Sequence, residues 1–220
     1  MPVRGLLLDA GGVLIGPVGG RWNPRFDFES VVERRLPDLP RDRYPEAFAA
    51  GQRLLDAATG TAARADYHRA ILRVLGVDRP DPALLAELEQ PSAAPPVEPY
   101  PEVPAVLDEL RARGVPMAVV SDSWPDLADL LARLGLRGYF DALVISALLG
   151  CRKPDPRMYR AGSDGLGLAP ADCLFVDDDP ELVRAAVALG YQGLAVVRAG
   201  QPPADLPWIA TLADLVALTR

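Results

Sequence analysis

The sequence has little histidine and little cysteine: one histidine, His68, and two cysteines, Cys151 and Cys173. A Ser-His-Asp triad or a zinc site with several histidines therefore lacks its parts, unless His68 supplies them alone. His68 lies in RADYHRAILRVLG, a segment of helical periodicity, so we expect it to be a surface or packing residue of that helix. Two cysteines make no disulfide framework, and we expect both to be reduced packing residues of a cytoplasmic protein.

The chain also lacks long apolar runs and an excess of positive charge. No run approaches the roughly 20 residues that a membrane-spanning helix needs. The apolar run within MPVRGLLLDAGG is too short for a signal peptide and leads into a glycine turn. The formal net charge of −7 argues against nucleic acid or an anionic membrane as a partner, because both favour basic patches. We therefore expect a cytoplasmic protein that binds neither.

Lysine is as scarce as histidine. Lys153 is the single lysine among 23 basic residues, and the rest are arginines. A chain that uses arginine almost everywhere raises the question of what this position needs, since a compact ammonium group and a planar guanidinium are not equivalent. Lys153 is therefore a candidate functional residue, and a solvated surface charge is the alternative.

Two kinds of pattern divide the chain. Residues 3–8 are apolar and stop at Asp9, which predicts a buried strand that ends in a tight glycine turn. From about residue 28 to 90 the apolar spacing predicts helices punctuated by Pro or Gly. The proline-dense residues 91–104 predict a linker. After it, predicted strands and helices alternate, which is typical of βαβ units in a parallel sheet.

The first strand is short and apolar like the later strands, so we expect it to belong to the same sheet. In the sequence, however, the helical stretch separates it from them. The sequence therefore predicts an α/β protein, with a Rossmann-like parallel sheet core and an inserted α-helical cap domain. We expect the core to comprise residues 1–15 and 98–220 and the cap to comprise 16–97.

Ligands of an open parallel sheet bind beyond the carboxyl ends of its strands. Polar residues follow the predicted strands at this edge: Asp9, Ser121, Asp122, Asp177, Asp178 and Asp179. Lys153 precedes a predicted helix in a nearby loop. Several carboxylates with one cation suit a metal ion plus an anionic substrate. Of the acidic triplet, we expect Asp179 to cap the helix that starts at Pro180.

These residues resemble, in order, the four motifs of the haloacid dehalogenase-like (HAD) hydrolase superfamily. The matching segments are LLLDAGGVL at 6–14, MAVVSDS at 117–123, CRKPDPRMY at 151–159 and LFVDDDPELVRAA at 174–186. The resemblance covers nearly the whole chain. It implies the subclass with an α-helical cap inserted after the first motif.

The resemblance also implies a mechanism. Asp9 would attack phosphorus and carry an aspartyl-phosphate, and Mg²⁺ would offset the repulsion between the two anions. The implied metal ligands are Asp9, the Gly11 carbonyl, Asp177 and Asp178; the implied phosphate-binding residues are Ser121, Asp122 and Lys153. The expected partner is a small-molecule phosphate ester, because a helical cap favours a small phosphorylated metabolite over a phosphoprotein. A homodimer formed through the caps is compatible with this arrangement.

Gly11 departs from the family pattern. Family phosphatases usually have a second Asp there, which protonates the leaving group and later activates water. A general acid or base contributes about 10²–10⁴-fold to a rate. Two alternatives therefore stay open: a haloacid dehalogenase-type hydrolase, in which Asp9 attacks carbon without a metal, and a catalytically weakened HAD-fold binding protein. The pair Asp177-Asp178 argues against the dehalogenase, since such relatives usually lack it.

The segment GGRWNPRFDFE at 19–29 follows the first motif. One hypothesis is that Arg21 or Arg25 reaches the substrate and that Asp27 replaces the missing acid. The alternative is a structured linker with Trp22 packed. The sequence does not decide between them.

Overall fold

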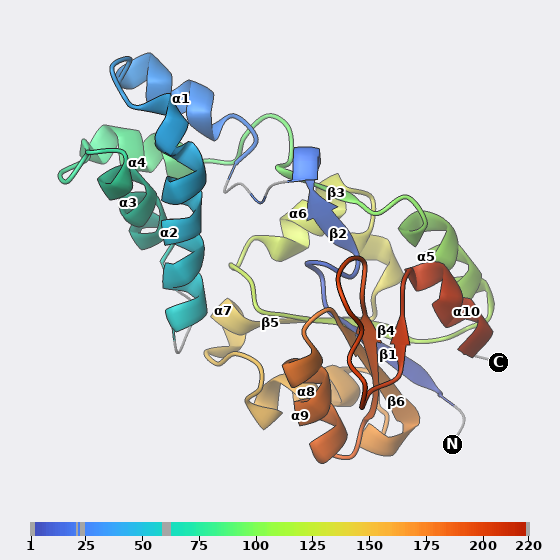
Figure 1. The fold of residues 1–220 in the computed structure, drawn as a ribbon. Helices are drawn as coiled ribbons and strands as arrows, with labels where there is room; N and C mark the ends of the chain where they lie inside the picture. Colours follow the sequence, from blue (N-terminus) through green and yellow to red (C-terminus); the bar gives the residue numbers. More distant parts are fainter. Residues whose placement is uncertain (1–2, 21, 23–24, 59–62, 219–220) are drawn as a thin grey trace. The chain divides into compact units, whose positions relative to one another are not determined.

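The computed structural model of the protein describes residues 3–20, 22, 25–58 and 63–218. A parallel sheet of six strands, in the order β5-β4-β1-β6-β7-β8, lies at the centre of its α/β core (Figure 1). The strands are β1 Gly5–Leu8, β4 Met117–Ser121, β5 Ala142–Ile145, β6 Cys173–Asp177, β7 Gln192–Val196 and β8 Trp208–Ile209. Each neighbouring pair is parallel.

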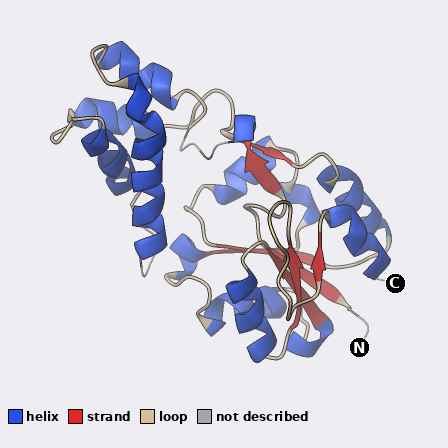
Figure 2. Ribbon diagram, in the orientation of Figure 1, coloured by secondary structure: helices blue, strands red, loops and turns tan. Residues whose placement is uncertain are grey.

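Apolar runs explain why β1, β4 and β6 occupy the middle of the sheet. Every residue of these strands is buried, as expected for parallel strands covered by helices on both faces. Helices α8 (Pro156–Gly165) and α9 (Pro180–Ala188) cover one face, and α5 (Val103–Ala112) and α10 (Leu215–Leu218) cover the other (Figure 2). Helix α8 packs closely because Gly162 has no side chain: a Cβ there would lie 2.7 Å from a methyl carbon of Val120.

The core also contains the short helices α6 (Leu127–Arg133) and α7 (Ser146–Leu149). Short 3₁₀ helices are formed by Val18–Gly20, Arg41–Arg43, Arg137–Tyr139, Pro170–Asp172 and Leu212–Asp214.

As predicted, Asp179 caps α9, since its side chain accepts a hydrogen bond from the Glu181 N–H. Cys151 and Cys173 are free and buried, in agreement with packing roles.

The chain forms two compact units, one of Met1–Gly16 and Glu98–Arg220 and one of Pro17–Val97. The second unit consists of the helices α1 Phe28–Arg35, α2 Tyr44–Ala57, α3 Arg64–Val74 and α4 Pro82–Glu89. Its core includes Phe28, Ile71 and Leu88, which are at most 2% exposed. His68 of α3 is also fully buried there, so it is a packing residue and not a surface residue. The predicted fold class, a parallel α/β core with an inserted α-helical unit, is confirmed.

The predicted linker at 91–104 contains a strand that the sequence analysis did not predict. Val97–Pro99 forms strand β3, which pairs with β2 (Ile15–Pro17) in a separate two-stranded sheet. Three-residue strands are too short to show a period of two, and their prolines argue against a strand unless it lies at an edge. The sequence analysis also did not predict strand β8 or helix α7, because both are too short to show a periodic pattern.

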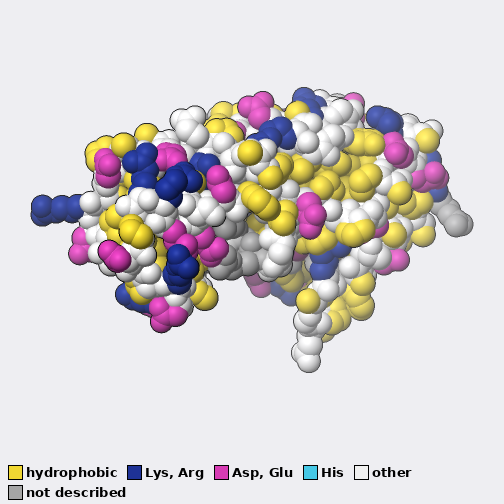
Figure 3. Space-filling view, turned by 90° about the horizontal axis from the view of Figure 1, so that it is seen from above, with side chains coloured by type: hydrophobic (Ala, Val, Ile, Leu, Met, Phe, Trp, Pro, Cys, Tyr) yellow, Lys and Arg dark blue, Asp and Glu magenta, His cyan; other side chains and the backbone are white. Residues whose placement is uncertain are grey.

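Charged side chains of both signs are interspersed over the face drawn in Figure 3. Some of the charged residues of the protein are paired along a helix, such as Arg69 with Asp66 and Arg111 with Asp108. Exposed pairs of this kind stabilise a fold by about 0–1 kcal/mol. No helix among the described residues is both long and apolar enough to span a membrane.

Candidate active site

The register of the sheet brings the predicted acidic residues together. Leu8 lies opposite Val176, so the next residue, Asp9, lies beside Asp177. The Asp9 N–H donates to the Val176 carbonyl at 2.9 Å and fixes this alignment. On the other side β1 pairs with β4, which ends at Ser121. The first, second and fourth motifs therefore meet at the carboxyl edge of three adjacent strands.

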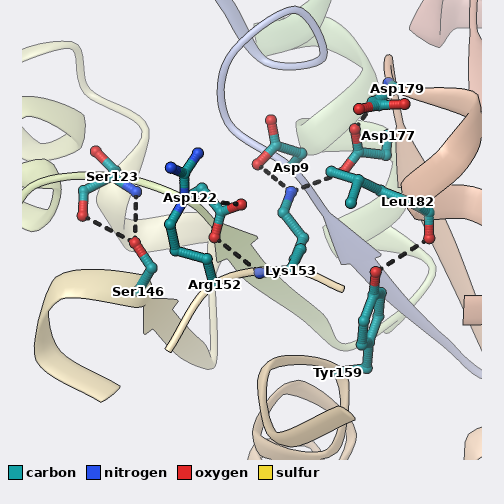
Figure 4. Close-up of polar contacts among 10 residues, drawn as sticks. All are labelled: Asp9, Asp122, Ser123, Ser146, Arg152, Lys153, Tyr159, Asp177, Asp179 and Leu182. Carbon is teal, nitrogen blue, oxygen red and sulfur yellow. Dashed lines mark hydrogen bonds and ion pairs between the residues drawn. The ribbon is translucent and has the colours of Figure 1, made fainter. Parts of the chain in front are cut away.

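Lys153 lies between two of these carboxylates (Figure 4). Its Nζ is 2.8 Å from Asp9 Oδ1 and 2.6 Å from Asp177 Oδ2. The side chains of Lys153 and Asp177 are each 2% exposed, and that of Asp9 is 11% exposed. The alternative of a solvated surface lysine is thereby excluded. One ammonium group reaches the nucleophile candidate and the acidic motif from a third loop.

Burial and mutual repulsion shift the protonation of the site. Burial raises the pKa of Asp177 to about 7, although Lys153 acts in the opposite direction. Burial, followed by the charge of Asp9, raises the pKa of Asp178 to about 6. Burial alone would lower the pKa of Lys153, but Asp9 and Asp177 outweigh it and the pKa lies above its usual value. The site thus places three carboxylates around one lysine, and Lys153 pairs with two of them.

Asp9, Asp177 and Asp178 each offer a carboxylate oxygen, and these oxygens all lie within 4.8 Å of one another. Such an all-oxygen group can hold a hard divalent cation. Asp177 already uses both oxygens, one for Lys153 and one to accept the Asp179 N–H at 2.9 Å. Asp9 and Asp178 are therefore the members best able to direct an oxygen at an ion.

The loop after Asp9 supplies a further oxygen. Within residues 10–15, backbone N–H groups of the loop, the Tyr100 N–H and Arg198 donate hydrogen bonds to the carbonyl oxygens. Among the described residues, the Gly11 carbonyl is the exception and accepts none of these bonds. Gly11 is half-buried, and its carbonyl oxygen, free of donors from the described residues, is therefore open to a ligand.

Gly12 allows Asp178 to approach the loop. Its φ of +72° is in the left-handed region that favours glycine. A Cβ at this position would lie 2.0 Å from Asp178 Oδ2. The absence of a side chain at Gly12 is therefore what permits the carboxylate of Asp178 to lie against the backbone of the nucleophile loop.

Ser121 and Asp122 follow β4 and have different surroundings. Ser121 is buried at the strand end, 4% exposed. Asp122 Oδ1 accepts the Lys153 backbone N–H at 3.1 Å, and Oδ2 lies 3.7 Å from Arg152 Nε. Burial raises the pKa of Asp122, and Lys153 opposes that shift. These contacts make Asp122 an anchor for the loop that carries Lys153.

The hypothesis about residues 19–29 gains no support from the structure. Arg21 lies outside the described residues. Arg25 is 7% exposed and binds Asp27 and the carbonyls of Glu87 and Gln90, all within the helical unit. The hydrogen bond from Arg25 holds the pKa of Asp27 below its usual value, which disfavours Asp27 as a proton donor. Trp22 is 45% exposed, so the expectation that it is packed is wrong; the role proposed for Arg21 stays a prediction.

Arg198 is a residue of this region that the sequence does not single out from the other arginines. It follows β7 and donates to the carbonyls of Gly12 and Val13. Together with Tyr100 it lines a pocket of about 300 Å³ that opens beside Asp178. No motif or spacing signals this role; only the fold brings residue 198 to the loop after Asp9.

Comparison with known proteins agrees with the geometry. The sequence matches the haloacid dehalogenase-like hydrolase family over residues 3–190. Phosphatase MT3486 of Mycobacterium tuberculosis is 27% identical over 208 residues, which cover 91% of this chain and 90% of that protein. The phosphoserine phosphatase of Thermus thermophilus is 37% identical over 105 residues, which cover 47% of this chain and 42% of that protein.

The fold is also similar to a solved dehalogenase. The L-2-haloacid dehalogenase from Xanthobacter autotrophicus aligns over 98% of both chains with a TM-score of 0.72 and 23% sequence identity. At this identity the likeness concerns the fold. The family match over most of the sequence, the parallel core and the order of the motifs agree: this chain belongs to the haloacid dehalogenase-like hydrolases.

Proposed function

We propose that this hydrolase is a Mg²⁺-dependent phosphatase that acts on a small phosphorylated metabolite through an aspartyl-phosphate on Asp9. The observation that carries the proposal is the third carboxylate, Asp178. It lies beside Asp9 and against Gly12, where Lys153 does not pair with it. Attack on carbon needs no such cation site, whereas attack by a carboxylate on a phosphate dianion does.

The donor set fits Mg²⁺. Asp9, Asp178 and the Gly11 carbonyl would hold the ion, with Asp177 beside them. All are oxygen donors, which Mg²⁺ prefers. When bound, the ion would supply positive charge that offsets the repulsion between the nucleophile and the phosphate oxygens.

The other roles in the reaction would belong to Asp9, Lys153 and Ser121. Lys153 holds Asp9 Oδ1 at 2.8 Å, which fixes the orientation of the carboxylate and leaves the other oxygen to attack phosphorus. As the new O–P bond forms, the bond from phosphorus to the leaving oxygen breaks. The leaving oxygen takes up a proton from solvent. Water then attacks the phosphorus as the bond from phosphorus to Asp9 breaks, which releases inorganic phosphate and a proton and restores the Asp9 carboxylate. The Ser121 hydroxyl and the Lys153 ammonium would bind the phosphate oxygens throughout.

The helical unit, residues 17–97, would act as the cap. Caps of this kind exclude bulk water from the reaction and admit small molecules. Arg25 and Asp27 belong to the internal structure of this unit. We therefore assign the substrate-binding residues of the site to the core and leave Arg25 and Asp27 out of the chemistry.

A panel of small phosphate esters, assayed with Mg²⁺ and with EDTA, tests the proposal. We expect phosphate release that needs Mg²⁺ and is lost in Asp9→Asn. L-2-chloropropionate belongs in the same panel, because chloride release in EDTA would identify the dehalogenase alternative. Binding of Mg²⁺ with no turnover of any compound would favour the HAD-fold binding protein.

A further inference from the structure

All three nitrogens of the Arg198 guanidinium group donate hydrogen bonds, two of them to the loop after the nucleophile. Nε donates to the Gly12 carbonyl at 2.7 Å and Nη2 to the Val13 carbonyl at 2.8 Å. Nη1 donates to Glu102 Oε1 at 2.8 Å. The guanidinium carbon lies 3.4 Å from the centre of the Tyr100 ring. One side chain therefore joins two consecutive loop carbonyls to the start of α5.

The partners of Arg198 are themselves fixed. Glu102 Oε1 also accepts the Leu212 N–H at 3.4 Å. The Tyr100 N–H donates to the Leu14 carbonyl at 3.1 Å. A Cβ on Gly16 would lie 2.7 Å from the Tyr100 ring, so the chain passes directly against that ring. Glu102 and Tyr100, the two side chains that hold Arg198, are therefore fixed themselves. Tyr100 also contacts the loop directly, at Leu14 and Gly16.

The loop needs these contacts from outside because its own residues do little to fix its conformation. Gly11 and Gly12 are adjacent, and glycine loses more conformational freedom on ordering than any other residue. The hydrogen bonds from Arg198 orient the peptide groups that follow Gly12 and Val13. With those carbonyls held on the side of Arg198, the Gly11 carbonyl keeps the orientation in which no described protein group binds it.

We propose that Arg198 is a positioning residue for the Gly11 carbonyl and, through it, for the metal site. The metal part of this inference rests on the proposed function. Arginine suits the task because a planar fork can bind two carbonyls and a carboxylate at once while one face stacks on an aromatic ring. Lysine has neither the fork nor the flat face.

The variants Arg198→Met and Arg198→Lys test the proposal against Arg184→Met. Arg184 is an arginine of the same unit that pairs with Glu181 and Asp205 and makes none of the described hydrogen bonds to residues 10–16. Two measurements are needed in each variant. Hydrogen exchange of the backbone amides of residues 10–16 without metal reports on the loop, and calorimetric titration with Mg²⁺ reports on the site.

We expect faster exchange in the loop of Arg198→Met and a Mg²⁺ dissociation constant raised by about 10–100-fold, the usual effect of losing a group that orients a ligand. Arg198→Lys should be intermediate and Arg184→Met unchanged. In turnover assays, kcat at low Mg²⁺ should fall and recover at high Mg²⁺, while KM changes little. Recovery by excess metal separates positioning from general loss of structure.

Either of two results would overturn the inference: unchanged exchange in the loop, or faster exchange with unaltered Mg²⁺ affinity. If Arg198→Met does not fold, the same criteria apply to Arg198→Lys. If the parent protein binds no Mg²⁺ but the loop still loosens in the variant, the proposed function fails. In that case the metal part of this inference falls with it, and only the support of the loop by Arg198 stands.

Discussion

Lys153 and Asp177 form a buried ion pair, with Nζ 2.6 Å from Oδ2 and both side chains 2% exposed. Lys153 also binds Asp9, so removing the lysine would leave two buried carboxylates facing each other without a cation. A buried charge that loses its partner is costly, because neither water nor an opposite charge compensates it. The pair therefore links the stability of the fold to the integrity of the site.

Replacement of Lys153 by Met should lower the free energy of unfolding by about 3–5 kcal/mol. Arg184→Met removes an exposed partner of Asp205 instead, and we expect a much smaller loss because solvent screens that pair. Urea denaturation in EDTA measures both. If both variants lost the same free energy of unfolding, the buried pair would stabilise the fold no more than the exposed pair does.

Substitution of Gly12 by Ala should damage the metal site more than it damages the fold. The new Cβ would collide with the Asp178 carboxylate at 2.0 Å. Gly114 provides a matched control, since its φ of +70° is nearly the same and no atom of the described residues lies within 4 Å of a Cβ there. Both variants incur a backbone strain of about 1–2 kcal/mol.

Only Gly12→Ala should weaken Mg²⁺ binding and phosphatase activity, the latter by about 10²-fold, as expected for a misplaced catalytic group. Titration calorimetry and phosphate release measure these two effects. If Gly114→Ala were equally inactive, the loss would come from strain and not from displacement of Asp178.

Gly11 predicts a dependence on the leaving group. The usual acid is absent at this position, so esters whose leaving oxygen needs protonation should react slowly. We expect kcat/KM for p-nitrophenyl phosphate to exceed that for simple alkyl phosphates by about 10²–10⁴-fold, the usual contribution of a general acid. Rates that do not vary with the pKa of the leaving group would mean that another residue donates the proton.

His68 predicts a pH dependence of stability. Its ring is fully buried near Phe28, and neither ring nitrogen has a hydrogen-bond partner among the described residues. Burial, aided by the charges of Arg64 and Arg25, lowers the pKa of His68 to about 3. The unfolded chain has a histidine pKa of about 6.5 and so binds a proton that the folded chain excludes.

Stability from this source is therefore complete above about pH 6.5 and falls by about 1.4 kcal/mol per pH unit below it, until the folded pKa is reached. His68→Phe keeps an aromatic ring and removes the titration. Between about pH 7 and pH 5, the parent should lose about 2 kcal/mol more than the variant in urea denaturation. Equal losses would show that the histidine is not held neutral.

The sequence was most informative where a long apolar run ends in a polar residue. The runs before Asp9, Ser121 and Asp177 predicted the three central strands and the edge at which those residues meet. The scarcity of lysine marked Lys153, and the structure places it between Asp9 and Asp177. These signals work because burial and strand direction are local properties of the chain.

Other features depend on tertiary structure and have no local signal. Arg198 is one arginine among many, and it reaches Gly12 only because the loop after β7 returns to the nucleophile loop. Tyr100 and Glu102 lie in a proline-rich segment that resembles a linker. The sequence offered Arg25 as a substrate contact, but the structure shows its side chain buried within the helical unit.

The central claim is that Asp9 itself becomes phosphorylated, and chemical trapping tests it most directly. The enzyme is mixed with a turned-over phosphate ester and Mg²⁺, quenched within a turnover and reduced with borohydride, which converts an aspartyl-phosphate to homoserine. Peptide mass spectrometry should find homoserine at position 9 in the parent and none in Asp9→Asn. Turnover with an unmodified Asp9, or with homoserine at another position, would contradict the account.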